Sequence, residues 1–138
     1  MISRPLGELA DSMGIRLIEA NPERTVATMP VIGNRQPLGL LHGGASALLA
    51  ETVGSVAASL SAGEGRFAVG IELNISHHRS ATDGTVTAVA TAAQLGKTLA
   101  VYNIELTDDQ GRRVASGRLT CLLRDAEKRP TVVGVTPL

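Results

Sequence analysis

Aromatic side chains and a net charge are both nearly absent from this sequence of 138 residues. It contains no tryptophan, one phenylalanine (Phe67) and one tyrosine (Tyr102), and its 13 basic residues are balanced by 13 acidic ones. Proteins that bind nucleic acids need cations to neutralise phosphates and usually aromatic rings on which bases stack. The composition provides neither, so we expect no nucleic-acid partner.

Cysteine is also scarce, since Cys121 is the only one in the sequence. A lone cysteine excludes an internal disulfide framework and a zinc site made of several cysteines. The adjacent His77 and His78 point to opposite faces of a predicted strand, which argues against a metal site formed by both. We therefore expect no metal and no other cofactor, and a cytoplasmic location.

Long hydrophobic runs are limited to residues 44–62, which are mostly Ala, Ser, Gly, Leu and Val with one charge at Glu51. The first twenty residues lack the apolar stretch of a secretory signal. A central carboxylate is costly in a membrane-spanning helix. We therefore predict that residues 44–62 form a helix buried inside the protein, and we expect no membrane partner.

Hydrophobic periodicity predicts the order of the other elements. Apolar residues at positions 6, 9, 10 and 13 are spaced as on one face of a short helix over 5–13. Glycines and a proline predict a loop over 31–41, directly before the long helix. The predicted strands are residues 15–20, 24–29, 69–78, 85–95, 98–107 and 112–124.

The last four predicted strands are joined by short turns, which favours an antiparallel meander in which each strand pairs with the next. The strand over 69–78 alternates between apolar and polar residues, which predicts that one of its faces is buried. Its predicted inward residues are Val69, Ile71, Leu73, Ile75 and His77.

Together these elements predict an α+β fold with one antiparallel sheet curled around one central helix. A helix that is apolar on all sides needs cover on all sides, and a curled sheet would provide much of it. The length predicts a single domain over 1–138. Prolines at positions 130 and 137 predict that residues 125–138 are a loose tail.

Glu51 is the most informative residue of the predicted helix, because its neighbours in the sequence offer no cationic partner within one turn. An unpaired carboxylate in a packed interior is costly, and such groups often mark functional sites. The alternative is a glutamate that reaches solvent or pairs with a distant arginine.

The start of the long helix carries the pair Gly43-Gly44, preceded by His42. The first amides of a helix have no partner within the helix, and the positive end of the helix dipole lies behind them. They can therefore stabilise a carbonyl oxygen that becomes an oxyanion. The alternative is a tight junction that needs glycine for steric reasons, with a structural histidine beside it.

The spacing of these groups predicts a two-fold dimer. Glu51 lies eight residues after Gly43, which is roughly 12 Å along one helix axis and too far for both to act on one carbonyl carbon. If both act, Glu51 comes from a second subunit whose helix runs in the opposite sense. Ser55 is on the same face as Glu51 and could bind a water there.

Residues 36–55, QPLGLLHGGASALLAETVGS, resemble the signature of hot-dog-fold acyl-CoA thioesterases. The similarity is to the phenylacetate-degradation-type superfamily, in the branch of the 4-hydroxybenzoyl-CoA and 1,4-dihydroxy-2-naphthoyl-CoA thioesterases, and it extends over about residues 5–124. It implies a hot-dog fold, in which an antiparallel sheet wraps one long helix. It also implies hydrolysis of an aroyl- or medium-chain acyl-CoA thioester to the free acid and CoA.

The resemblance implies a role for five residues of this run. Glu51 matches the catalytic carboxylate, which acts as nucleophile or as base for a water, and Gly43 matches the amide that polarises the thioester carbonyl. Gln36 and His42 match positions near that carbonyl and the leaving sulfur, and Ser55 matches a residue that positions the attacking water. The resemblance also implies sites across a homodimer interface and pairing of dimers into a homotetramer.

Candidate CoA-binding residues lie near the ends of predicted strands. The resemblance implies contacts of two such regions with CoA, while an isolated strand-end cation is more often a solvated charge. The candidates are His77, Arg79, Ser80, Lys97, Thr98 and Arg124.

Two other functions fit a hot-dog fold. A non-catalytic acyl-CoA sensor would use the same groove, but it usually carries an additional output domain. An enoyl-CoA hydratase needs an acid–base pair of the Asp/His type, and no histidine follows Glu51 by four or five residues. The sequence leaves open which acyl group is cleaved and whether Glu51 is nucleophile or base.

Overall fold

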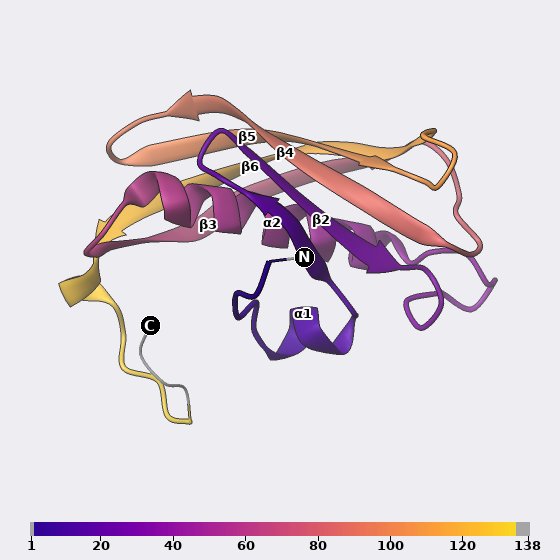
Figure 1. The fold of residues 1–138 in the computed structure, drawn as a ribbon, viewed down its shortest axis with the longest axis horizontal. Coiled ribbons are helices and arrows are strands. Elements are labelled where there is room, and N and C mark those ends of the chain that lie inside the picture. The colour runs from indigo at the N-terminus through magenta and orange to yellow at the C-terminus, as the bar shows by residue number, and fades with distance from the viewer. Residues whose placement is uncertain (1, 135–138) are drawn as a thin grey trace.

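The computed structural model describes residues 2–134, and its elements match the predicted order (Figure 1). Most predicted boundaries agree with the structure to within three residues. The elements are α1 (Glu8–Ser12), β1 (Arg16–Ala20), β2 (Arg24–Pro30), α2 (Gly43–Ala62), β3 (Arg66–His77), β4 (Thr85–Leu95), β5 (Leu99–Thr107), β6 (Arg113–Asp125) and a short 3-10 turn (Ala126–Lys128).

Within residues 2–134 six strands form one antiparallel sheet in the order β1-β2-β4-β5-β6-β3, and this sheet curves around α2 (Figure 1). The close approach of helix and sheet depends on small residues. A Cβ added at Gly54 of α2 would lie 2.6 Å from Leu119 Cδ2 of β6, so any larger residue would require Leu119 to move. This architecture confirms the predicted α+β hot-dog fold.

The predicted meander is correct for β4, β5 and β6 and wrong for β3. β3 pairs with β6, and β4 pairs with β2 on its other side. The connection over residues 78–84 is longer than a tight hairpin turn, so it can cross to the far side of the sheet. Its Ala81 is buried and accepts a hydrogen bond from Leu41 N, which fixes the crossing segment to the loop before α2.

The predicted alternation of β3 is also partly wrong. A β-bulge lies between Gly70 and Glu72, and such a bulge adds one residue and shifts the alternation of faces. Leu73 and Ile75 pack against the core as predicted, whereas Val69 and Ile71 are exposed. In the N-terminal half of β3, Ala68 packs against the core, and a Cβ added at the exposed Gly70 would face Leu119 and Glu51.

Helix α2 is covered on part of its circumference rather than on all sides. It is long and apolar enough to cross a membrane by length and composition, but just over half of it is buried within the fold, as in the core helices of other proteins. Glu51 is exposed in the single chain, which corrects the expectation of a buried carboxylate. The residues of α2 that are not fully buried are Gly43, Gly44, Ala47, Leu48, Glu51, Thr52, Ser55, Ser59, Leu60 and Ser61.

The predicted loose tail over 125–138 begins later than expected. Asp125 is the last residue of β6, and the 3-10 turn follows it. Residues 135–138 lie outside the described residues, so the looseness of the tail stays a prediction.

Candidate active site

A pocket of about 340 Å³ lies at the start of α2, where the end of β3 and the loop before the helix meet. Several predicted site residues, far apart in the sequence, come together in it. They are Gln36, Gly43, His77, Arg79 and Ser80. The other lining residues are Leu40, Leu41, Ser46, His78, Ala81 and Val114.

The first amides of α2 are not equally available. His42 is the N-cap residue, and its Nδ1 accepts a hydrogen bond of 2.8 Å from Gly44 N. His42 O accepts hydrogen bonds from Ala45 N at 2.9 Å and Ser46 N at 3.2 Å. Within residues 2–134, Gly43 N–H is left without an acceptor. A free amide at the positive end of a helix can stabilise an oxyanion.

A side chain at position 43 would also be crowded. A Cβ at this position would lie 3.0 Å from His77 Nε2, because the end of β3 passes directly beside the first turn of α2. Gly43 therefore combines a tight steric fit with a backbone amide that is available to a ligand.

Gln36 is fixed in a tight turn at the rim of the pocket. Its backbone N donates to Leu40 O at 2.8 Å, its backbone O accepts from Gly39 N at 2.9 Å, and its side-chain oxygen accepts from Leu38 N. Gly39 has a φ of 85°, which favours glycine. In the described part of the chain, the Gln36 side-chain NH2 has no acceptor of its own.

His42 is exposed and does not line the pocket. Its Nδ1 accepts the Gly44 hydrogen bond, so the neutral ring carries its proton on Nε2. The single chain therefore gives His42 a capping role at the helix start.

Glu51 and Ser55 lie away from this pocket, on the side of α2 that faces the edge strand β3. Glu51 Oε1 is 3.5 Å from the position of a Cβ added at Gly70. Burial raises the pKa of the neighbouring Cys121 thiol to about 11, and the Glu51 charge also raises it, while a hydrogen bond with Ser55 lowers it. Glu51, Ser55 and Cys121 thus form one cluster, which a single chain does not bring to the Gly43 amide.

The CoA-binding candidates form two groups at opposite ends of β3. Arg79 and Ser80 follow its C-terminal end and line the pocket. Arg124 pairs with Phe67 near its N-terminal end. There Thr98 O accepts a hydrogen bond of 2.7 Å from Leu123 N, next to Lys97. The two groups are about 30 Å apart along the strand at the usual rise per residue.

His77 and His78 point to opposite faces of the sheet, as predicted. His77 lies against Gly43, whereas His78 Nε2 is 2.7 Å from Ser116 Oγ. Within residues 2–134, no three His, Cys, Asp or Glu side chains lie close enough together to hold a metal ion.

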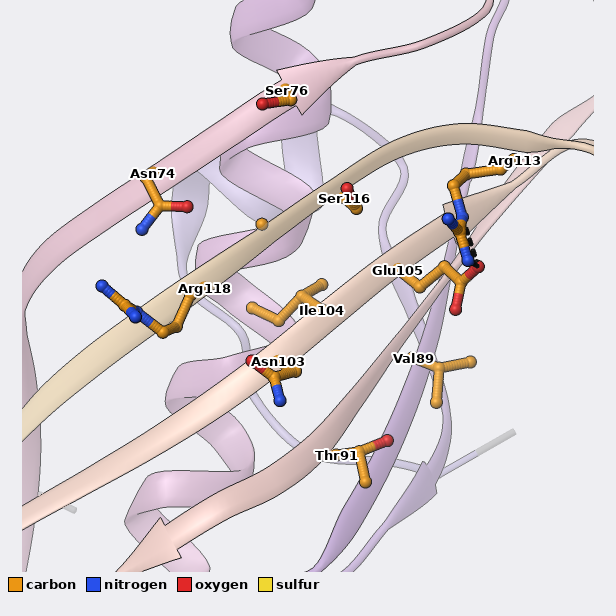
Figure 2. A pocket seen from close by; sticks show the side chains of 11 residues that line it. Asn74, Ser76, Val89, Thr91, Asn103, Ile104, Glu105, Arg113, Ser116 and Arg118 are labelled. Atoms are coloured by element: carbon orange, nitrogen blue, oxygen red, sulfur yellow. Dashed lines mark hydrogen bonds and ion pairs between the residues drawn. The ribbon is translucent and has the colours of Figure 1, made fainter.

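A larger hollow of about 570 Å³ lies on the outer face of the sheet, and Figure 2 shows the side chains around it. Asn74, Asn103 and Arg118 come from three neighbouring strands, and an ion pair of 2.6 Å joins Arg113 and Glu105. None of the predicted site residues lines this hollow.

The two aromatic residues do not line the pocket at the start of α2. Tyr102 is fully buried in the core, and Phe67 pairs with Arg124 at the far end of β3. The buried Ser46, which does line the pocket, was not among the predicted site residues. Its position three residues after Gly43, on the same helix face, is a signal that could have identified it.

Known proteins resemble this chain in sequence and in fold. A family model described as the thioesterase superfamily matches residues 38–115. The chain is 43% identical over 115 residues to 1,4-dihydroxy-2-naphthoyl-CoA hydrolase of Escherichia coli, covering 83% of this chain and 85% of that protein. It is 42% identical over 116 residues to proofreading thioesterase EntH of Cronobacter turicensis, again covering 83% of this chain and 85% of that protein. The fold matches the crystal structure of a thioesterase of Haemophilus influenzae with a TM-score of 0.82 and 37% identity, covering 86% of this chain and 83% of that one.

Proposed function

The chain belongs to the thioesterase superfamily, and on this premise we propose that it hydrolyses an aroyl- or medium-chain acyl-CoA thioester to the free acid and CoA. The observation that carries this proposal is the Gly43 amide, which has no acceptor within residues 2–134 and belongs to a residue that lines the pocket. The leucines and valine of the pocket wall would contact the acyl group. Apolar walls distinguish substrates weakly, by roughly 1–3 kcal/mol per methylene.

In the proposed reaction a water oxygen forms a bond to the thioester carbonyl carbon, and the Glu51 carboxylate takes a proton from that water. The carbonyl oxygen becomes negative and is held by Gly43 N–H. The carbon–sulfur bond then breaks, its electron pair leaves with sulfur, and the CoA thiolate takes up a proton. If Glu51 attacks the carbon itself, an acyl–glutamyl anhydride forms first, and water cleaves it in a second step.

The long edge strand β3 supports the dimer that this reaction needs. β3 has 12 residues, and within the described chain it pairs only with β6. A long free edge exposes backbone N–H and C=O groups to another strand. Pairing of β3 with β3 of a second copy would satisfy these groups and continue the sheet through both subunits.

A two-fold axis near Leu73 and Asn74 would complete the site. In an antiparallel pair centred there, Gly70 of one chain lies opposite His77 of the other. Glu51 is next to Gly70, and Gly43 is next to His77. The pairing would therefore bring the Glu51 carboxylate of one subunit toward the free Gly43 amide of its partner. Within one helix these two groups are roughly 12 Å apart along the axis, too far to act together.

The same axis would join the two groups of CoA-binding candidates. Phe67 of one chain would lie opposite Ser80 of the other, and Phe67 pairs with Arg124 in its own chain. Arg79 and Ser80 of one subunit would then lie beside Arg124, Lys97 and Thr98 of the other. Cations from both chains could neutralise the phosphates of a single CoA.

We also propose that two such dimers form a homotetramer. Pairing along β3 leaves the outer face of the sheet free, including the hollow of about 570 Å³ in Figure 2. Measurement of the mass in solution by light scattering tests this part, since a dimer at all concentrations would contradict it.

Release of free thiol from a panel of aroyl-, phenylacetyl- and alkyl-CoA substrates tests the proposed function. We expect Glu51→Gln to lower kcat on the order of 10³-fold without loss of folding, since Glu51 is exposed in the single chain. Glu72→Gln, which changes an exposed carboxylate on β3, is the matched control and should keep full activity. Unchanged turnover in Glu51→Gln would contradict the proposal, and tight acyl-CoA binding without thiol release would indicate a binding module instead.

Mixing two variants tests whether each site spans two subunits. Gly43→Ala keeps the backbone N–H, but its Cβ would lie 3.0 Å from His77 Nε2, and we expect this crowding to displace the bound carbonyl and abolish activity. After subunit exchange between Glu51→Gln and Gly43→Ala proteins, half of the dimers are mixed, and each mixed dimer contains one intact site. Activity should therefore recover to about a quarter of the wild-type value. If each site is built within one chain, mixing will restore nothing.

A further inference from the structure

Ser46 is one of two polar residues among the buried ones in the described chain, and the two differ in their hydrogen bonds. Thr25 is 0% exposed, and its Oγ1 donates to Asn21 O at 2.9 Å. Ser46 is 2% exposed and lines the pocket at the start of α2. Within residues 2–134 the Ser46 hydroxyl has no hydrogen-bond partner.

The usual local acceptor for a helical serine is already occupied. A serine within a helix commonly donates to the carbonyl four residues before it, which here is His42 O. That oxygen accepts the backbone N–H groups of Ala45 and Ser46. Every fully enclosed side-chain oxygen or nitrogen in the described chain has a hydrogen-bond partner. Ser46 Oγ has none, so it is not fully enclosed. The pocket that Ser46 lines is the space onto which its hydroxyl can open.

Ser46 lies one helical turn after Gly43, the residue that carries the free amide. Ser46 follows Gly43 by three residues, which places it on the same helix face about 4.5 Å further along the axis. Both residues line the same pocket. A carbonyl oxygen that accepts Gly43 N–H would therefore lie near the Ser46 hydroxyl.

Building on the proposed thioester hydrolysis, we infer that Ser46 is a further catalytic residue, which donates a second hydrogen bond to the thioester carbonyl oxygen. A role as nucleophile is not supported, because no basic side chain of the described residues accepts its proton. A neutral donor in a site shielded from water strengthens its bond as negative charge develops on the oxygen. In the free protein the Ser46 hydroxyl has no acceptor among the described residues, and the carbonyl oxygen of a bound substrate would supply one.

Ser46→Ala tests this inference through kcat, KM and thermal stability. We expect kcat to fall by on the order of 10²-fold, with KM changed much less, because the bond is strongest in the transition state. The melting temperature should not fall, since the hydroxyl that alanine removes makes no hydrogen bond to another group of the described chain. Thr25→Val is the matched control: it should lower the melting temperature by several degrees and leave kcat unchanged.

Binding of two non-hydrolysable CoA analogues gives a readout independent of turnover. One analogue is a ketone that keeps the carbonyl oxygen, and the other is an alkyl thioether without it. Ser46→Ala should weaken binding of the ketone by about fivefold and leave binding of the thioether unchanged.

Three outcomes would overturn the inference. Wild-type kcat in Ser46→Ala would show that Ser46 does not act on the reaction, while the proposed hydrolysis would stand. A lower melting temperature with equal loss of binding for both analogues would show a structural role. Absence of thiol release by the wild-type protein from every acyl-CoA in the panel would overturn the proposed function together with this inference.

Discussion

The two edge strands of the sheet, β1 and β3, each contain a β-bulge, but the residues around the two bulges differ. Each edge strand contains a bulge with an exposed isoleucine, Ile18 in β1 at 46% exposure and Ile71 in β3 at 56%. β1 has five residues and β3 has 12. Glu51 and Gly43 of α2 lie beside β3, whereas β1 contributes the buried Leu17 to the core. A short edge resists pairing with other chains, so the comparison supports the proposal that β3 is the edge used for assembly and chemistry.

Of the substitutions that test the difference between the two edges, Ile71→Lys should have the largest effect on dimerisation and activity. A lysine on an edge strand has to lose water when a second strand pairs alongside it, and natural proteins use this to prevent edge pairing. We expect the dimer to dissociate at micromolar concentration. Since the proposed site needs both chains, kcat/KM at low protein concentration should fall by on the order of 10²-fold. Sedimentation and thiol release measure the two effects.

Ile18→Lys is the matched control, because it introduces the same charge at the bulge of the other edge. It should remain dimeric and active. Equal loss of dimer in both variants would mean that the edges do not differ in function, and an active dimer of Ile71→Lys would rule out pairing along β3.

The buried thiol beside β3 should make stability depend on pH. Burial raises the pKa of Cys121 from 9.0 to about 11 in the folded chain. Between these values the unfolded chain has lost this proton and the folded chain keeps it, so the free energy of unfolding falls as pH rises. We expect a fall of about 2 kcal/mol between pH 9 and pH 11 from this group.

Denaturant titrations of the wild type and Cys121→Ala at pH 8 and pH 11 check this. Alanine leaves a cavity and lowers stability at both pH values, so the informative quantity is the difference in pH slope. Burial also raises the pKa of Tyr102, and the Cys121 charge adds to that rise, so only the burial-driven part of the Tyr102 titration cancels in that difference. Identical slopes would contradict the role of Cys121.

Arg79→Ala and Arg124→Ala should each raise KM for acyl-CoA by about tenfold with little change in kcat, because each removes one cation from the proposed phosphate site. Added salt should reduce the difference. Arg113→Ala is the control, since Arg113 pairs with Glu105 on the outer face. A higher KM in Arg79→Ala with an unchanged KM in Arg124→Ala would contradict a CoA site built from both ends of β3.

The fold was predictable from the sequence where local patterns decide it. The period of two located the strands, and the apolar run located α2. The pairing of β3 with β6 was not predictable, because it depends on the crossing of residues 78–84 and not on strand pattern. The shift at Gly70 was missed because a bulge leaves the sequence alternation intact while it changes the face of each side chain.

The candidate site was predictable to a similar degree. The motif around Gly43 marked the helix start, and the structure places Gln36, His77 and Arg79 at the same pocket. Ser46 was missed because a serine in an Ala-rich helix is marked only by its spacing, three residues after Gly43. Its unpaired hydroxyl is visible only when the neighbouring backbone hydrogen bonds are known.

Tyr102→Phe should give the smallest effect, and it tests the structural role of the β1 side. The Tyr102 hydroxyl donates a hydrogen bond of 2.6 Å to Pro22 O in the turn between β1 and β2, and so ties this edge to β5. Phenylalanine keeps the packing and loses the bond, which should lower stability by about 1 kcal/mol and the melting temperature by about 3–5 °C. Calorimetry measures this shift, and kcat/KM should be unchanged because Tyr102 lies outside the pocket. A variant with normal stability and reduced kcat would place catalytic function on the β1 side and so remove the contrast between the two edges.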